Sequence, residues 1–199
     1  MVNAIIVVDD GSAEPIRKSL ADFPVTILRH RTNLGQGAAL QTGIVYARKL
    51  DADIVITFDA DGQHNAEDVA GLIAPIVQNQ ADIVLGSRFL PESQTRLALS
   101  RKFVLQTARL INYLLSGVLL SDAHNGLRAL NKTALEKINL TENRMAHASE
   151  ILFEIKRHEL RYIEVPVLIK YTDYSKQKGQ STHDSIKVLF DLVLHKLFK

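Results

Sequence analysis

Residues 54–64 read IVITFDADGQH, and this stretch indicates both the fold class and a candidate site. Its apolar and β-branched start predicts a buried strand, which delivers Asp59 and Asp61 into a tight glycine turn. Two carboxylates at a strand end suit a hard divalent cation such as Mg²⁺ or Mn²⁺, which takes oxygen ligands and shares them with substrate phosphates. Gln63 and His64 are further candidates for metal ligands or for the hydrogen-bond partners of ligands. The alternative is that this motif is only a turn followed by a capped helix.

The residues on both sides of this stretch alternate short β-branched runs with helical patterns. This alternation predicts an open α/β layer with a mainly parallel sheet flanked by helices. Further strands are expected at 4–8, 25–29, 82–85, 126–130 and 162–170, and helices at 14–21, 36–50, 66–78, 103–120, 146–157 and 182–199. Ligands of such sheets bind beyond the carboxyl ends of the strands, where Asp9 and Asp10 join the first two carboxylates. No linker or repeat interrupts the chain, so residues 1–199 are expected to form one domain.

The composition is that of an ordinary soluble domain, with 199 residues of which 46% are hydrophobic and 23% charged. The chain has no cysteine, which excludes disulfides, thiolate catalysis and cysteine-ligated metal sites. Residues 1–100 hold 8 basic and 12 acidic residues, whereas residues 101–199 hold 16 and 10, which suggests a site where a cation and an anionic ligand meet. A basic patch interleaved with aromatic residues is missing, so nucleic acid is not an expected partner. The first strand follows no signal peptide, so a cytoplasmic protein is expected.

Short motifs follow one another along the whole chain. In order they are DDGS (9–12), NLGQGA (33–38), DADGQH (59–64), GSRF (86–89), DAHNGLR (122–128), EVPV (164–167) and KGQS (178–181). Their joint order resembles the family 2 inverting glycosyltransferases of GT-A fold, a Rossmann-like α/β fold. Among these it is most similar to the polyprenyl-phosphate glycosyltransferases of the dolichol-phosphate mannosyltransferase group. The resemblance implies a metal-dependent enzyme of glycan or cell-envelope biosynthesis, which transfers a sugar from a GDP- or UDP-sugar to a polyprenyl phosphate.

The resemblance implies donor-binding roles at the carboxyl ends of two expected strands. Asp9 or Asp10 would contact the base or the ribose of the nucleotide. Asp59, Asp61 and Gln63 would hold the Mg²⁺ or Mn²⁺ ion and the diphosphate. The donor-binding set implied in this way is Asp9, Asp10, Asp59, Ala60, Asp61 and Gln63.

Four basic residues complete the site that the resemblance implies. Arg88 and Arg101 match positions that face the acceptor phosphate in the lipid-phosphate group. Arg128 and Lys178 would stabilise the diphosphate leaving group, because fixed positive charge counters the negative charge that builds up there in the transition state. For each of the four, a solvated surface charge is the alternative, which is strongest for Lys178 in its polar loop.

The need for a catalytic base depends on the acceptor. A lipid phosphate is ionised near neutral pH and attacks without losing a proton, whereas a sugar hydroxyl needs a general base. Glu150 follows His147 by one helical turn, near the place where hydroxyl-transferring relatives keep an acidic base, and it is a candidate base. A surface carboxylate of the helix is an equal alternative. Transfer to a sugar hydroxyl of a growing polysaccharide and a non-catalytic fragment or assembly module therefore stay open as alternative functions.

Residues 33–37, NLGQG, open a helix after a strand, where glycines permit positive φ angles and close backbone approach. This loop is either a phosphate cradle or a site of close packing between strand and helix, and packing is the favoured interpretation. Gln36 stands where many relatives carry a lysine.

The chain departs from the resemblance at its N-terminus. Relatives begin with a further strand that packs centrally in the sheet, whereas here residues 1–4 lead directly into what corresponds to their second strand. We therefore expect a domain that is truncated relative to the family. Removal of a central strand leaves two neighbours with unpaired backbone groups, so self-association of the chain through an exposed strand edge is expected.

Two apolar helical segments are candidates for the lipid side of such an enzyme. Residues 182–199 predict an amphipathic helix with a wide apolar face, which must be buried or lie in an interface. Residues 103–120 are interrupted by polar side chains and do not predict a transmembrane helix. Core packing is the default for both. The alternative is peripheral association with the inner face of the membrane or with a membrane-protein partner.

Overall fold

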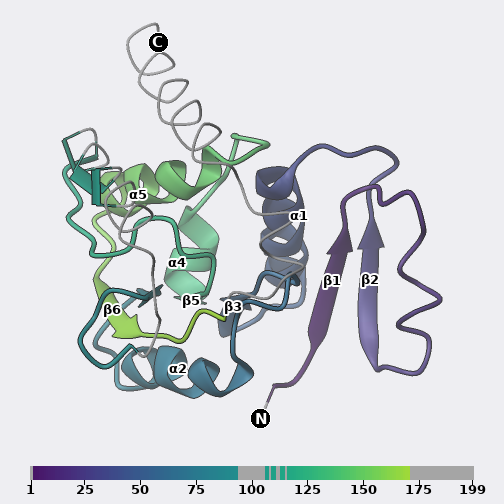
Figure 1. Cartoon of the computed structure of the whole chain (residues 1–199), viewed down its shortest axis with the longest axis horizontal. Coiled ribbons are helices and arrows are strands. Elements are labelled where there is room, and N and C mark those ends of the chain that lie inside the picture. The colour runs from purple at the N-terminus through teal and green to yellow at the C-terminus, as the bar shows by residue number, and fades with distance from the viewer. Residues whose placement is uncertain (1, 94–105, 108, 111–112, 115, 171–199) are drawn as a thin grey trace, which may run out of the picture.

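The strands of the protein form two sheets that lie side by side in the computed structural model, which describes residues 2–93, 106–107, 109–110, 113–114 and 116–170 (Figure 1). The strands are β1 (Ile5–Asp9), β2 (Val25–Arg29), β3 (Ile54–Thr57), β4 (Ile83–Ser87), β5 (Arg128–Asn131) and β6 (Tyr162–Pro166). The helices are α1 (Gln36–Lys49), the short 3₁₀ helix η1 (Ala66–Asp68), α2 (Val69–Val77), α4 (Lys132–Lys137) and α5 (His147–Arg157).

Most strands of the sheets run in a common direction. In the smaller sheet β1 and β2 are parallel, with Ile5 opposite Val25. The larger sheet has the strand order β3-β5-β4-β6, in which β4 and β6 are parallel and β5 is antiparallel to both of its neighbours. Within this sheet β3, β4 and β6 therefore run the same way and only β5 is reversed. The open, mainly parallel α/β architecture expected from the sequence is confirmed.

Helices cover both faces of the larger sheet. Val84 on β4 packs with Leu72 and Ile76 of α2 on one face. Its neighbours Ile83 and Leu85 point the other way, into a second apolar cluster with α1, α4 and α5. Figure 1 shows α2 on one side of the sheet and α4 and α5 on the other. Because successive side chains of a strand alternate between faces, β4 is buried along its whole length and forms the centre of the domain.

A break separates β1 from β3. Among the described residues β1 pairs only with β2 and β3 pairs only with β5, so each strand has one open edge, although α1 packs against both (Figure 1). Ile5 on β1 is 53% exposed, and Ile54, Val55 and Ile56 on β3 are only partly buried. In the described part of the chain, β1 and β3 therefore each present one unpaired edge.

Some predicted elements differ from the observed ones. The helix predicted at 14–21 is wrong, because this segment forms turns. The segment is mostly exposed, and a helix of about eight residues without a packing partner is marginal in water. The strand predicted over 162–170 ends at Pro166, whose ring removes a backbone donor, and only Ile169 beyond it forms an isolated bridge, with His64.

The described residues between 106 and 116 are helical, in agreement with the helix predicted over 103–120. Residues 182–199, with the predicted amphipathic helix, lie outside the described residues. In the part of the chain that the structure describes, no helix is long and apolar enough to cross a membrane.

Candidate functional site

Asp59 follows β3 and is held by contacts from several directions. Nε2 of Gln36 donates a hydrogen bond to Oδ1 of Asp59 over 2.7 Å, and Nε2 of His64 lies 3.4 Å from Oδ2. Gly126 lies against the same carboxylate, because a Cβ at this glycine would overlap Oδ2 of Asp59. The hydroxyl of Thr57 holds the glycine there by donating a hydrogen bond to its carbonyl oxygen over 2.6 Å. The start of α1, the turn after β3 and the loop before β5 together place this aspartate.

The Asp59 side chain is ionised at neutral pH. Burial alone raises the pKa of this carboxyl, but the hydrogen bond and charge of His64 and the charge of Arg128 outweigh burial, so the pKa lies below its ordinary value of 3.8. The side chain is 35% exposed. A cation or a ligand can therefore reach a carboxylate that is already charged.

Arg128, the first residue of β5, is 2% exposed. Its Nε and Nη1 atoms have no hydrogen-bond partner among the described residues. Burial lowers the pKa of Arg128, and the charges of Asp59 and Asp122 raise it. The net result is a pKa of about 10, so the guanidinium is positively charged at neutral pH. A buried cation with unsatisfied donors costs free energy unless an anionic group pairs with it. The surroundings of Arg128 are therefore suited to an anion such as a diphosphate.

Asp61 and Gln63 lie in the turn after Asp59. Oδ1 of Asp61 accepts a hydrogen bond from the backbone N–H of Gln63 over 2.9 Å, and Oδ2 accepts one from its side-chain amide over 2.8 Å. In the described part of the chain, no three histidine, aspartate or glutamate side chains gather into a metal-binding group. Two carboxylates fit Mg²⁺ or Mn²⁺, because these ions take one or two carboxylates and complete their coordination with water and substrate oxygens.

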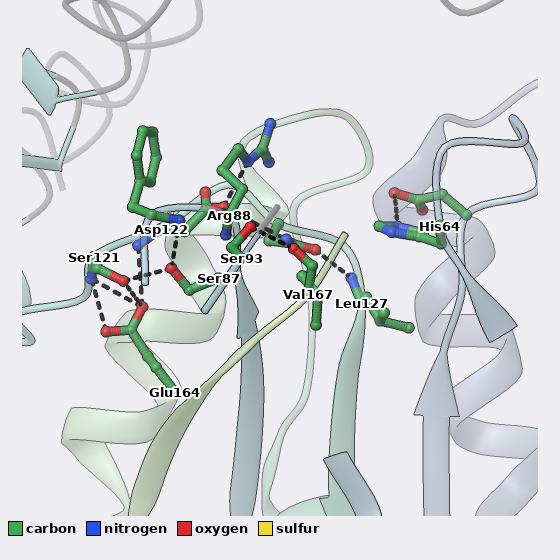
Figure 2. Close-up of polar contacts among 12 residues, drawn as sticks. His64, Ser87, Arg88, Ser93, Ser121, Asp122, Leu127, Glu164 and Val167 are labelled. Atoms are coloured by element: carbon green, nitrogen blue, oxygen red, sulfur yellow. Dashed lines mark hydrogen bonds and ion pairs between the residues drawn. The ribbon is translucent and has the colours of Figure 1, made fainter. Parts of the chain in front are cut away.

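Arg88 follows β4 and is fixed by Asp122. Oδ2 of Asp122 accepts hydrogen bonds from the backbone N–H of Arg88 over 3.1 Å and from its Nε over 2.6 Å. The carboxylate of Glu164 on β6 accepts hydrogen bonds from the backbone N–H groups of Ser121 and Asp122. Figure 2 shows Asp122 between Glu164 and Arg88. The sequence assigned no role to Asp122 or Glu164, and their membership of two quoted motifs was the only signal that pointed to them.

Asp9 and Asp10, at the end of β1, both form hydrogen bonds or ion pairs with other residues of the protein. Asp9 is buried and forms an ion pair with Arg29, with 3.1 Å between Oδ2 and Nη1. Oδ1 of Asp10 accepts a hydrogen bond from the backbone N–H of Leu34, and Oδ2 accepts one from that of Gly35. Asp10 therefore ties the end of β1 to the loop before α1. Contact of either aspartate with a nucleotide stays a prediction.

Gly35 and Gly37 pack closely against the loop before α5. Gly35 has a φ of +110°, and a Cβ on it would meet the backbone of Asn143. A Cβ on Gly37 would overlap the carbonyl oxygen of Glu142. These contacts support close packing rather than a phosphate cradle. Gln36, between the two glycines, donates a hydrogen bond to Asp59. It is a site residue to which the sequence assigned no role.

Glu150, the candidate base, binds the loop that precedes α5. Oε1 accepts hydrogen bonds from the backbone N–H and the hydroxyl of Thr141 over 2.8 and 2.6 Å, and Oε2 accepts one from the N–H of Glu142 over 3.0 Å. One turn earlier, Nδ1 of His147 lies 2.6 Å from the carbonyl oxygen of Arg144, and burial lowers the pKa of this histidine. Both carboxylate oxygens of Glu150 thus have protein partners, and its role as a base stays a prediction.

Three predicted site residues add little to this geometry. Ala60 is exposed in the turn between Asp59 and Asp61. Arg101 and Lys178 lie outside the described residues, and their roles stay predictions.

Known proteins resemble this chain over most of its length. The model of the family "Glycosyl transferase family 2" matches residues 3–139. A UDP-N-acetylglucosamine–dolichyl-phosphate N-acetylglucosaminyltransferase from Methanococcus voltae is 34% identical over 215 residues, which cover 98% of this chain and 86% of the relative. A polyprenol monophosphomannose synthase from Mycolicibacterium smegmatis is 35% identical over 144 residues, which cover 69% of this chain and 54% of the relative.

Solved structures share the fold. The glucosyl-3-phosphoglycerate synthase from Mycobacterium tuberculosis, in complex with Mn²⁺, UDP-glucose and phosphoglyceric acid, matches with a TM-score of 0.65 and 17% identity. The match covers 96% of this chain and 69% of that one. At this identity the likeness concerns the fold alone, and it confirms the GT-A architecture expected from the motifs.

Proposed function

The chain belongs to glycosyl transferase family 2, and from this membership we propose that it transfers a sugar, with inversion, from a nucleotide-sugar to a polyprenyl phosphate. The observation that carries the proposal is that Arg128 lies opposite Thr57 in the register of β3 and β5, two residues before Asp59, so a buried guanidinium suited to a diphosphate and a carboxylate suited to a cation lie at the same end of the sheet. The names of the Methanococcus and Mycolicibacterium relatives, which specify dolichyl phosphate and polyprenol monophosphomannose, support a lipid phosphate as acceptor.

The proposed cation site consists of Asp59 and Asp61 with Gln63. When Mg²⁺ or Mn²⁺ is bound, it neutralises charge on the donor diphosphate. The Mycobacterium tuberculosis enzyme, solved with Mn²⁺ and UDP-glucose, supports an ion of this kind. Asp9 or Asp10 is assigned to the base or ribose of the GDP- or UDP-sugar.

Arg128 is assigned to the leaving group. In the proposed reaction an oxygen of the acceptor phosphate attacks the anomeric carbon from the face opposite the diphosphate. The bond from that carbon to the diphosphate breaks, and its electron pair moves to the departing oxygen. A buried guanidinium already in place stabilises this charge without reorganisation, and Lys178 is assigned the same task.

Arg88 and Arg101 are assigned to the acceptor phosphate. Because a lipid phosphate attacks in its ionised form, the reaction needs no general base. This agrees with Glu150, whose two carboxylate oxygens accept hydrogen bonds from Thr141 and Glu142. These bonds give Glu150 a structural role in holding the loop before α5, which is the role that a lipid-phosphate acceptor leaves to it.

Peripheral association with the inner face of the cytoplasmic membrane is part of the proposal, since polyprenyl phosphates are membrane lipids. Leu110, Tyr113 and Leu114 are 57%, 41% and 73% exposed, and their spacing places them on one helix face. This face supports contact with lipid tails, and a membrane-protein partner that covers it is the alternative.

Transfer of a radiolabelled sugar tests the proposed function. The purified chain is mixed with Mn²⁺, a polyprenyl phosphate in detergent, and GDP-mannose, UDP-glucose or UDP-N-acetylglucosamine. We expect labelled lipid from one donor, and loss of labelling with EDTA or in Asp61→Ala. Label that reached only an oligosaccharide would overturn the lipid-phosphate acceptor. No transfer by the folded chain would favour a non-catalytic module.

A further inference from the structure

Glu164 fixes two consecutive residues of the loop before β5. It lies on β6, opposite Leu85 in the parallel register with β4. Its Oε1 and Oε2 atoms accept hydrogen bonds from the backbone N–H of Ser121 over 2.9 and 2.8 Å. Oε1 also accepts one from the Ser121 hydroxyl over 2.8 Å and one from the backbone N–H of Asp122 over 3.0 Å. The position of residues 121 and 122 therefore depends on this carboxylate.

A second connection ties this loop to the end of β4. Oγ of Ser121 lies 2.5 Å from Oγ of Ser87, the fully buried last residue of β4. Oγ of Ser87 in turn accepts a hydrogen bond from the backbone N–H of Phe89 over 3.1 Å. The two serine hydroxyls thus connect Glu164 with the segment that carries Arg88, as Figure 2 shows.

Asp122 contacts Arg88 directly in a site with little water. The side chains of Asp122 and Arg88 are 1% and 9% exposed, and Oδ2 of Asp122 lies 2.6 Å from Nε of Arg88. Charge-assisted hydrogen bonds between buried groups are strong and directional. Since Glu164 holds the backbone of Asp122, a change at Glu164 alters the direction in which Asp122 presents its carboxylate to Arg88.

We propose that Glu164 is a positioning residue that holds Arg88 in place for the acceptor phosphate, acting through Ser121 and Asp122. This inference rests on the proposed function, which assigns Arg88 to that phosphate. Loss of the Glu164 charge releases the loop, so Arg88 samples more orientations and binds the phosphate less tightly. The donor side is farther along the same loop: Asn125 donates a hydrogen bond to Asp122 over 3.4 Å, and the next residue, Gly126, lies against Asp59.

Exchange of the Arg88 Nε proton, followed by NMR, tests the placement without an activity assay. The Arg88→Lys variant identifies the signal. Because Nε donates to Asp122 in a buried site, its proton exchanges slowly in the wild type. In Glu164→Gln we expect exchange at least about 10-fold faster, and in Ser121→Ala a smaller increase. Unchanged exchange in Glu164→Gln would overturn the proposal. If that variant does not fold, unchanged exchange in Ser121→Ala overturns it instead.

Kinetics test the consequence for the acceptor. In Glu164→Gln we expect the KM for polyprenyl phosphate to rise about 10-fold. The Kd of UDP or GDP with Mn²⁺, measured by calorimetry, is expected to rise much less, because Glu164 contacts Ser121 and Asp122 and not Gly126, which lies against Asp59. An unchanged acceptor KM, or an equal loss of donor affinity, would contradict a role for Glu164 at the acceptor. If the wild type transfers nothing to polyprenyl phosphate, the proposed function fails, and the exchange of the Arg88 proton still decides whether Glu164 places Arg88.

Asp82, which directly precedes β4, is a matched control carboxylate. It accepts hydrogen bonds from the backbone N–H, Nε and Nη2 of Arg161 over 2.9, 3.1 and 2.8 Å, but it lies at the opposite end of β4 from Arg88. Asp82→Asn is expected to lower stability while the Arg88 exchange rate and the acceptor KM stay at the wild-type values. Equal effects of Asp82→Asn and Glu164→Gln would mean general loosening and would overturn the proposal.

Discussion

Gly126 lies so close to Asp59 that a β-carbon at position 126 would overlap the Oδ2 atom of the aspartate. The hydroxyl of Thr57 holds the glycine carbonyl in this position. The carboxylate proposed to bind the cation therefore depends on a glycine from the loop before β5, which is remote in sequence. Only a residue without a side chain permits this approach.

Gly126→Ala is expected to push the Asp59 carboxylate away and to weaken binding of UDP or GDP with Mn²⁺ by at least about 10-fold. Calorimetry of the folded variant measures the change. Gly71→Ala is the control, because a Cβ at Gly71 meets nothing within 4 Å and alanine favours the helix by up to about 1 kcal/mol. Wild-type affinity in Gly126→Ala would show that Asp59 is not needed for the cation.

Arg128→Met is expected to lower kcat by about 100-fold or more while the melting temperature changes little. The rate falls because the substitution removes the positive charge that is proposed to stabilise the leaving group. Stability is kept because methionine buries no unsatisfied donors, whereas Nε and Nη1 of Arg128 have no partner in the described part of the structure. Steady-state transfer and thermal unfolding of the same sample check both statements. A large fall in melting temperature with kcat unchanged would reverse the assignment.

The stability of the protein is expected to fall as the pH drops from 6.5 to 4, in part because of His124. Burial lowers the pKa of His124 from 6.5 to about 4, so the unfolded chain binds the proton first. The stabilisation is fully present above pH 6.5, and at pH 4 the loss from this group is about 3 kcal/mol at most. Urea unfolding at several pH values measures it. His124→Gln should show a flatter dependence, and an identical slope would contradict the assignment.

The open edges of β1 and β3 predict self-association of the chain. Sedimentation velocity over a range of concentrations is expected to show oligomers that dissociate on dilution. Ile5→Lys, on β1, should weaken association, because a charge on an edge strand opposes pairing with another chain. Val77→Lys, at the end of α2 with 70% exposure, is the control and should associate like the wild type. A strict monomer at every concentration would rule this out.

Local patterns along the chain were enough to predict most helices and strands and the turn after β3 that carries Asp59 and Asp61. β2 lies at Val25–Arg29 and α1 begins at Gln36, as the periodicity predicts, because side-chain alternation depends on neighbours a few residues apart. The same holds for β3, which ends just before Asp59. Residues 14–21 have a helical pattern but no surface to pack against, so the pattern there was misleading.

Which side chains lie close together follows from tertiary packing and could not be read from the motifs. Arg128 lies opposite Thr57, near Asp59, and Glu164 is connected to Arg88 through Asp122. Both arrangements depend on the pairing of strands that are distant in the sequence. Glu150, which the sequence offered as a base, uses its carboxylate on a nearby loop. Motifs could only nominate residues for the candidate site, because a motif gives the residue types and their spacing along the chain. Burial and hydrogen-bond partners set the charge and direction of each group, and these arise only when the strands and loops pack together.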